Sequence, residues 1–342
     1  MDLLIMSRDD IVARWKDRHL EIVNENKLPL YLAKTHNVER WLETRSIDRH
    51  RANSRLLIKA LRLTEKDDVQ TVISVNAATI TDSYWVKSPD STLTYADIRF
   101  NDDYFANLAL RGDYDSFNKA MNSKNSKTPE LTNIGSFEKC WKLTNGEWWM
   151  YKTANHSEMF SELFAFELGM ALGFNMAEYR REKKFIKTKD FTDHASVNYE
   201  PAYSFMSDGD DYIETVGELR ALGSNLVPDY VKMIFLDTLI ANPDRHTFNF
   251  GVLRSLEGKV LGLAPNFDNN MALIARGYPK NISRKNDVLA RFFKELLAFD
   301  NSLREFLPTV TEDIVWSVLT KMNMKVRSKT IVDFVMNGYR QI

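Results

Sequence analysis

The chain has 342 residues, of which 44% are hydrophobic and 27% are charged, and its formal net charge is -1. This composition is ordinary for a globular protein, and the length allows two domains or one large fold with two lobes. The small net charge argues against a protein that coats nucleic acid through bulk charge, and it leaves a local basic patch open.

The single cysteine, Cys140, excludes an internal disulfide and fits a reducing compartment. The first ten residues have no basic stretch ahead of their short apolar run, so they match a signal peptide poorly. No apolar run approaches the roughly 20 residues that a transmembrane helix needs. We therefore expect a cytoplasmic protein with no membrane partner.

The first 130 residues are expected to be mainly helical. Residues 7–25 and 36–68 space their apolar side chains as helices do. The second of these segments is rich in arginine, which fits either a solvated helix face or a contact surface for nucleic acid or an acidic partner. Residues 83–105 mix short aromatic strands with turns, and the polar residues 111–133 are typical of a linker.

The pattern changes after this predicted linker. Apolar runs on both sides of Asn145 and Gly146 predict a β-hairpin, because that dipeptide favours a type I′ turn. A helix is expected to begin at Ser157 and to end near Gly173. Further strands are predicted near 179–187 and 201–206, and helices at 228–241 and from about 287 to the end.

Strands followed by helices are the order of the two lobes of a protein kinase. We therefore expect an α+β fold of the bilobal, protein-kinase-like type. The predicted kinase domain covers residues 131–342, with a small β-rich lobe over 131–210 and a larger helical lobe over 211–342. Residues 1–130 form the predicted N-terminal region.

Three polar residues are the strongest sign of chemistry in the chain. Asp244 and Asn249 have the Asp-x-x-x-x-Asn spacing of a kinase catalytic loop, and Asp268 follows the next apolar run. Phosphoryl transfer needs a carboxylate that orients the attacking hydroxyl, and an amide oxygen and a second carboxylate that hold magnesium. We assign the first role to Asp244 and the metal to Asn249 and Asp268.

Two upstream features fit the nucleotide. Lys152 ends the second strand of the predicted hairpin, where kinases place a lysine on the nucleotide phosphates. Glu162 or Glu158, one turn apart on the following helix, would orient that lysine. A turn around Gly135 precedes the hairpin and could fold its free amides over phosphate oxygens.

Two neighbours of Asp244 have open roles. His246 is a candidate for the cofactor site or for a general base, and a purely structural loop histidine is the alternative. The role of Arg245 also stays open. The histidines and the single cysteine have no zinc-ligand spacing, and no Walker A, hydrolase-elbow or dinucleotide motif occurs.

These blocks resemble the HipA family of bacterial serine/threonine kinases, the toxins of some toxin–antitoxin pairs. The resemblance runs from about Leu131 to the end of the chain. It rests on Gly135 to Lys139, Tyr151-Lys152, Ser161-Glu162 with Leu172-Gly173, Asn242 to Gly251, and Pro265 to Asn270. The first 130 residues do not resemble the short β domain that usually precedes this kinase core, and they look instead like the helical leader of some HipA-like proteins.

The resemblance implies ATP and Mg²⁺ as cofactors, a protein substrate and an antitoxin partner. It also makes Gly135, Ser136 and Lys139 parts of a phosphate loop. In such kinases a serine of this loop can be autophosphorylated, which pushes the loop out; Ser136 is either that serine or only a turn residue. A phosphate there would repel those of the nucleotide.

Two other functions fit the same residues. One is a kinase whose acceptor is a small molecule or a lipid head group. The other is a pseudokinase that binds nucleotide without turnover and acts as a regulatory binding module. The retained Asp244, Asn249 and Asp268 count against the second alternative, since nucleotide binding without turnover has no need for all three.

Overall fold

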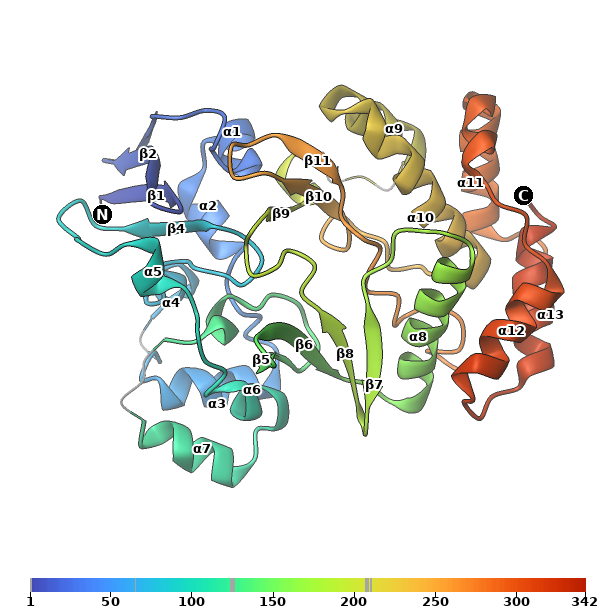
Figure 1. Ribbon diagram of the computed structural model, residues 1–342, viewed down its shortest axis with the longest axis horizontal. Helices are drawn as coiled ribbons and strands as arrows, with labels where there is room; N and C mark the ends of the chain where they lie inside the picture. Colours follow the sequence, from blue (N-terminus) through green and yellow to red (C-terminus); the bar gives the residue numbers. More distant parts are fainter. Residues whose placement is uncertain (1, 65, 124–126, 207–208, 210) are drawn as a thin grey trace. The chain divides into compact units, whose positions relative to one another are not determined.

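The computed structural model describes residues 2–64, 66–123, 127–206, 209 and 211–342. Over these residues the chain forms a mixed structure of helices and small antiparallel sheets (Figure 1). The residues group into two compact units. The first unit holds Met1–Thr153, Lys187–Glu200 and Leu253–Leu261, and the second holds Ala154–Ile186, Pro201–Val252 and Gly262–Ile342.

Within the described ranges, no helix combines the length and the apolar character that crossing a membrane requires. The predicted limits of the kinase domain at residue 131 and of its lobes at residue 210 stay predictions.

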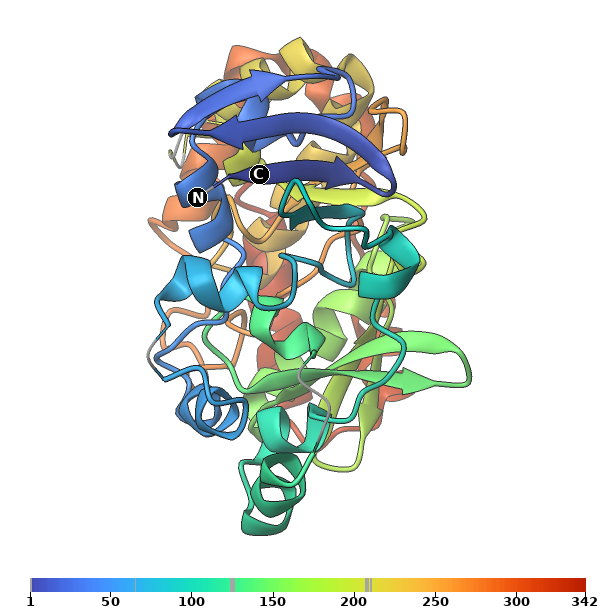
Figure 2. The same cartoon turned by 90° about the vertical axis from the view of Figure 1, so that its left-hand side faces the viewer.

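The first unit begins with a four-stranded sheet of order β3-β2-β1-β4. Figure 2 shows β1, β2 and β3 as neighbouring blue strands. The pairs β1–β2, β1–β4 and β2–β3 are all antiparallel. The strands are β1 (Leu3–Ser7), β2 (Asp10–Lys16), β3 (His19–Ile22) and β4 (Tyr84–Lys87).

The helix predicted over residues 7–25 is therefore wrong, because β2 and β3 occupy most of that range. Buried Val12, Ala13 and Trp15 lie next to exposed Arg14 and Lys16, so part of the segment follows the two-residue period of a strand. The turn after β2 has positive φ at Asp17 (51°) and Arg18 (62°), as type I′ requires. Neither residue is a glycine, so this turn lacks the dipeptide that predicts a hairpin.

Short helices follow the first strands and build the rest of the first unit. They share a core that includes Trp85, Phe105 and Leu57, each almost fully buried. The helical prediction for residues 36–68 is confirmed by α2 and α3, and the aromatic strand expected near residue 84 is β4. The helices are α1 (Leu30–Thr35), α2 (Val38–Glu43), α3 (Ala52–Ala60), α4 (Asp68–Ile73), α5 (Tyr95–Ile98), α6 (Ala106–Arg111) and α7 (Tyr114–Met121).

The linker predicted over residues 111–133 is also wrong. Helix α7 begins there with Asp113 as its N-cap, and the 3-10 helix η1 (Pro129–Thr132) follows. The four residues of η1 are buried, so this segment is part of the first unit's interior. Residues 124–126 of the predicted linker lie outside the described residues.

The predicted hairpin is confirmed. Strands β5 (Lys139–Thr144) and β6 (Glu147–Thr153) pair antiparallel around Asn145 and Gly146. These two turn residues have φ of 53° and 82°, the left-handed values of a type I′ turn. The chain direction reverses at the position that the dipeptide predicts.

Two further sheets have the orders β5-β6-β8-β7 and β11-β10-β9. The prediction of strands near 179–187 is confirmed by β7 and β8, whereas the strand expected over 201–206 is mostly the 3-10 helix η2 (Ala202–Ser204). The strands are β7 (Tyr179–Glu182), β8 (Phe185–Lys189), β9 (Asn198–Pro201), β10 (Gly251–Arg254) and β11 (Val260–Leu263).

Most of the helices of the second unit surround α10 (Val227–Ile240), which is buried over most of its length. The ring of Phe235 on α10 meets the rings of Phe174, Phe293 and Tyr339. The predictions at 228–241 and from 287 onward are confirmed. The remaining helices are α8 (His156–Ala171), α9 (Tyr212–Leu222), η3 (Ser224–Leu226), α11 (Val288–Phe299), η4 (Asn301–Phe306), α12 (Glu312–Met322) and α13 (Ser328–Tyr339).

Helix α8 begins slightly earlier than expected. Its N-cap is Asn155, and Glu158 completes a capping box by accepting the backbone N–H of Asn155 at 2.9 Å. The helix ends at Ala171, and Gly173 follows with φ of 75°. The stop signal is therefore confirmed, whereas the predicted start at Ser157 misses the true cap by two residues.

The substitution Gly146→Ala tests the hairpin. Gly146 has φ of 82° and nothing lies within 4 Å of an added Cβ, so the substitution changes only the backbone preference. We expect the free energy of unfolding to fall by about 1–2 kcal/mol in urea titrations. The control Gly217→Ala, in α9 with equally open surroundings, should raise stability by up to about 1 kcal/mol. A shift of the same sign in both variants would contradict the assigned turn.

Candidate active site

The candidate catalytic loop starts where α10 ends. Ala241 takes a left-handed conformation with φ of 49°, and the N–H of Asn242 donates to the carbonyl of Asp237 at 2.9 Å. The side chain of Asn242 then donates to the Asp237 carboxylate at 2.9 Å and accepts the N–H of Asp244 at 3.2 Å. These bonds turn the chain back at the helix end before Pro243 and set the backbone position of Asp244.

Arg245 is the centre of the polar network in the second unit. Its side chain is 4% exposed, and its Nε and Nη2 donate to the two oxygens of Asp237 at 2.8 and 2.9 Å. Asp237 is fully buried. Burying either charge alone would cost free energy, and the bidentate pair of Arg245 with Asp237 offsets that cost. Burial lowers the pKa of Arg245, but the Asp237 carboxylate outweighs it and the net shift is upward.

The same guanidinium joins two distant segments of sequence. Its Nη1 donates to the carbonyl of Asn249 at 2.7 Å and to the carbonyl of Phe267 at 2.8 Å. Its Nη2 also reaches the side-chain oxygens of Asn266 and Asn269 at 2.9 and 2.7 Å. One side chain therefore holds the catalytic loop against the segment that carries Asp268.

Asn249 is oriented by the loop itself. Its Nδ2 donates to the carbonyl of Asp244 at 2.8 Å, and its backbone N–H donates to the carbonyl of His246 at 2.8 Å. No donor to its Oδ1 occurs among the described residues. The amide oxygen is thus the part of Asn249 that can serve as a ligand for a hard cation.

Asp268 has a left-handed backbone, with φ of 62°. Its N–H donates to the hydroxyl of Tyr179 at 3.1 Å, and Tyr179 is also hydrogen-bonded to Glu162. Burial raises the pKa of the Tyr179 hydroxyl well above its ordinary value, and the neighbouring Glu162 and Asp268 raise it further. Tyr179 therefore stays protonated and fixes the backbone on which Asp268 is carried.

The donor set fits magnesium. In the part of the chain that the structure describes, no three His, Cys, Asp or Glu side chains gather as a metal site of their own. Magnesium does not need such a cluster, because it takes one or two protein ligands and completes its shell with phosphate oxygens and water. The carboxylate of Asp268 and the Oδ1 of Asn249 are ligands of this kind.

Glu162 is fully buried on α8 and accepts the N–H of Asn269 at 2.8 Å. It thereby ties α8 to the residue that follows Asp268. Lys152 is 5% exposed on β6. It belongs to the first unit and Glu162 to the second, so the pair of these residues stays a prediction. The alternative partner, Glu158, is engaged in capping α8.

The predicted phosphate loop, residues 133–138, lies in the first unit between η1 and β5. Gly135 has φ of 102°, and a Cβ added there would lie 2.5 Å from the Nζ of Lys139. The ammonium of Lys139 therefore packs directly against the loop where only glycine leaves room. Ser136 is exposed beside it.

His246 is exposed, and its Nδ1 accepts the N–H of Phe248 at 3.2 Å. The ring of Phe248 stacks on Tyr203 with centroids 4.6 Å apart. These contacts shape the catalytic loop and support the structural interpretation of His246. A contact of His246 with the cofactor stays a prediction.

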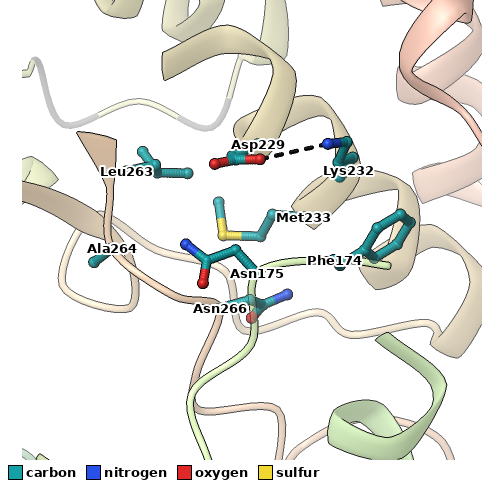
Figure 3. A pocket seen from close by; sticks show the side chains of 8 residues that line it. All are labelled: Phe174, Asn175, Asp229, Lys232, Met233, Leu263, Ala264 and Asn266. Carbon is teal, nitrogen blue, oxygen red and sulfur yellow. Dashed lines mark ion pairs between the residues drawn. The ribbon is translucent and has the colours of Figure 1, made fainter. Parts of the chain in front are cut away.

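A small pocket lies beside Asn266 (Figure 3). Apolar side chains such as Phe174 and Met233 line it, with the ion pair of Asp229 and Lys232 (3.6 Å) at one side. It has room for about one water molecule. It is therefore too small to be the nucleotide site.

Sequence reasoning missed the centre of this network. Asp237 stands between Leu236 and Thr238 in an otherwise apolar helix, and a buried carboxylate there must find a cationic partner. Lys232 and Arg245 are the two cationic residues within ten positions of Asp237, and Arg245 lies one loop further on. Burial of Asp237 thus indicates a partner such as Arg245, whereas the spacing of Asp244 and Asn249 does not show the role of Arg245.

Replacing Arg245 by methionine tests the network. The variant leaves the Asp237 carboxylate buried without its charge partner, so we expect a loss of about 3–5 kcal/mol in the free energy of unfolding. Adding Asp237→Asn should restore part of this loss, because it removes the uncompensated charge. Urea denaturation measures both.

Arg220→Met is the matched control, since Arg220 pairs with Asp300 at the surface of the same unit. This control should cost less than about 1 kcal/mol. An Arg245→Met variant as stable as the control would show that the buried pair does not hold the loop.

No protein-family model matches the chain, and no curated protein matches it. Solved structures do. HipA of Shewanella oneidensis MR-1, from a toxin–antitoxin complex with HipB and operator DNA, is similar over 99% of this chain and 97% of its own, with 12% sequence identity and a TM-score of 0.52. CtkA, a proinflammatory kinase of Helicobacter pylori, matches 60% of this chain and 90% of its own, with 19% identity and a TM-score of 0.41.

At 12% identity, the likeness to HipA shows the fold alone, and this chain has a HipA-like fold. The match covers nearly the whole chain, including most of the first 130 residues. The expected, mainly helical N-terminal region is confirmed by α1 to α7, but not at its start, because that region opens with the sheet β3-β2-β1-β4.

Proposed function

We propose that this protein is an ATP- and Mg²⁺-dependent serine/threonine protein kinase with a bilobal, HipA-like architecture. One observation carries the proposal: the Arg245 guanidinium binds both the catalytic loop, at the Asn249 carbonyl, and the residue before Asp268. Because Asn249 also bonds the Asp244 carbonyl, the three residues that phosphoryl transfer requires lie on one connected network.

In the proposed reaction the Asp244 carboxylate orients an acceptor hydroxyl and takes its proton. The hydroxyl oxygen bonds to the γ-phosphorus as the bond to the β–γ bridging oxygen breaks, which leaves ADP. Asp268 and Asn249 would hold Mg²⁺, and the bound ion would supply positive charge that stabilises the transferring phosphate. Lys152 and the loop of Gly135, Ser136 and Lys139 bind the phosphates.

The acceptor in this proposal is a protein hydroxyl, with Ser136 of the chain itself as one target. Ser136 is exposed on its loop, next to Gly135, which the Lys139 ammonium contacts. Its hydroxyl therefore meets the requirement that a phosphate acceptor be accessible to solvent. The HipA structure was determined with HipB and operator DNA. We extend the antitoxin partner to this chain as part of the proposal.

The substitution Asp244→Asn tests the assigned chemistry. It removes the proton acceptor but keeps the shape of the side chain, so transfer of labelled phosphate from ATP should fall at least about 100-fold. The affinity for ATP, measured by calorimetry, should change by less than about threefold because Asp244 is not assigned to the nucleotide.

The exposed Asp313 on α12 supplies the control, Asp313→Asn, which should behave as the wild type. Wild-type transfer by the Asp244 variant would reject its role. ATP binding without any transfer by the wild type, whether to proteins of a lysate, to lipids or to small molecules, would instead favour a pseudokinase.

Ser136→Ala tests self-modification. If Ser136 is the acceptor, labelling of the purified protein by γ-labelled ATP should be lost. Transfer to other proteins should be retained, because the loop is proposed to bind phosphate through its backbone N–H groups, which the variant keeps. Ser88→Ala, another exposed serine of the first unit, should leave labelling intact. Undiminished labelling of the Ser136 variant, followed by mass spectrometry, would move the site elsewhere.

A further inference from the structure

A buried arginine closes the base of the candidate phosphate loop. Arg51 is the N-cap residue of α3 and is 4% exposed. Its guanidinium donates to the carbonyl of Asn133 and, at 3.4 Å, to the carbonyl of Phe137. The two carbonyls lie at the two ends of the arch formed by residues 133–137, so one planar group holds both ends together.

Neighbouring side chains fix the same base. Glu130 accepts the Nδ2 of Asn133 at 3.1 Å and the N–H of Trp141, in β5, at 2.8 Å. The backbone N–H of Asn53, in the first turn of α3, donates to Glu138 at 3.1 Å. The loop is thus anchored to the start of α3 before it and to the start of β5 after it.

The tip of the arch is left open by this arrangement. Gly135 and Ser136 are exposed. Across the described residues, the N–H groups of residues 134–137 donate to no acceptor. An arch whose ends are fixed and whose amides have no internal acceptor is prepared for an anion, and the Lys139 ammonium beside Gly135 adds positive charge.

A contribution to the stability of the fold does not by itself explain the contacts of Arg51. Its Nε and the Oε2 of Glu138 are buried with no hydrogen-bond partner among the described residues, and each such group costs free energy. Burial lowers the pKa of Arg51, partly offset by Glu130 and Glu138, and raises the pKa of Glu130 to about 7. Buried charges that lower the stability of the fold in this way indicate that they are retained to hold the loop in position.

We propose that Arg51 is a positioning residue that sets the affinity for the nucleotide by holding the phosphate loop closed at its base. The N-terminal region then takes part in nucleotide binding through α3, although none of its residues needs to touch the nucleotide. This inference rests on the proposed kinase function for its ligand, whereas the clamp itself does not.

The first experiment measures the loop directly. Because the only native cysteine, Cys140, is buried, a nitroxide label on Ser136→Cys reports the loop tip alone. Replacing Arg51 by methionine should increase the mobility of this label, and replacing it by lysine should increase it less, since an ammonium can reach only one carbonyl at a time.

Arg45→Met is the matched control. Arg45 is also a largely buried arginine of the first unit, and it binds the carbonyls of Ala77 and Tyr84 and the carboxylate of Asp82. It has no bond to the loop among the described residues. Its loss should lower stability without changing the label, and unchanged label mobility in both Arg51 variants would overturn the clamp.

The second experiment measures ATP with unlabelled full-length protein. Arg51→Met should weaken ATP binding at least tenfold in calorimetry, while the rate of phosphate transfer at saturating ATP stays within threefold. Arg51→Lys should be intermediate and serves if the methionine variant does not fold, and Arg45→Met should bind as the wild type does.

The outcomes separate the two proposals. A mobile loop with unchanged ATP affinity would overturn the nucleotide role of Arg51. A wild-type protein that binds no ATP would overturn the proposed function and this role with it, and the label would still decide whether Arg51 closes the loop.

Discussion

A guanidinium removed from water is stable only when its charge meets a carboxylate and its N–H groups meet acceptors. The second unit satisfies this demand for Arg245 with Asp237, two carbonyls and two carboxamides. Because the acceptors come from α10, the catalytic loop and the residues on both sides of Asp268, the solvation requirement of one side chain fixes three parts of the chain. The geometry of the candidate site follows from this one buried charge.

The sequence predicts local features well where a single residue type decides them. Asn145-Gly146 predicts the hairpin turn, and Gly173 predicts the end of α8, because both need left-handed backbone. The helix predicted over residues 7–25 fails because no glycine marks its turn: Asp17 is common at positive φ but Arg18 is not, and the pairing of β2 with β3 holds both there. Spacing makes Asp244, Asn249 and Asp268 candidates, but a contact such as Arg245 to Phe267 depends on tertiary structure and cannot be predicted from spacing.

Arg51 and Arg245 are both buried arginines that stabilise a loop, but they differ in how many of their nitrogens have hydrogen-bond partners. Both donate to backbone carbonyls of a loop. The planar guanidinium of arginine can bind two carbonyls at once, whereas the ammonium of a lysine cannot. All the nitrogens of Arg245 have partners, whereas the Nε of Arg51 has none among the described residues. A fully satisfied buried network favours a single arrangement of its side chains, and an unpaired buried donor such as the Nε of Arg51 lowers stability.

The backbone at Asp268 has a consequence for how this chain can change over generations. A non-glycine residue with φ of 62° bears a standing conformational penalty, smaller for Asp or Asn than for most residues. A glycine at this position would relax the main chain and delete the carboxylate in one step. Selection for thermal stability alone would therefore favour glycine at residue 268, and the variant it favoured would have lost the carboxylate.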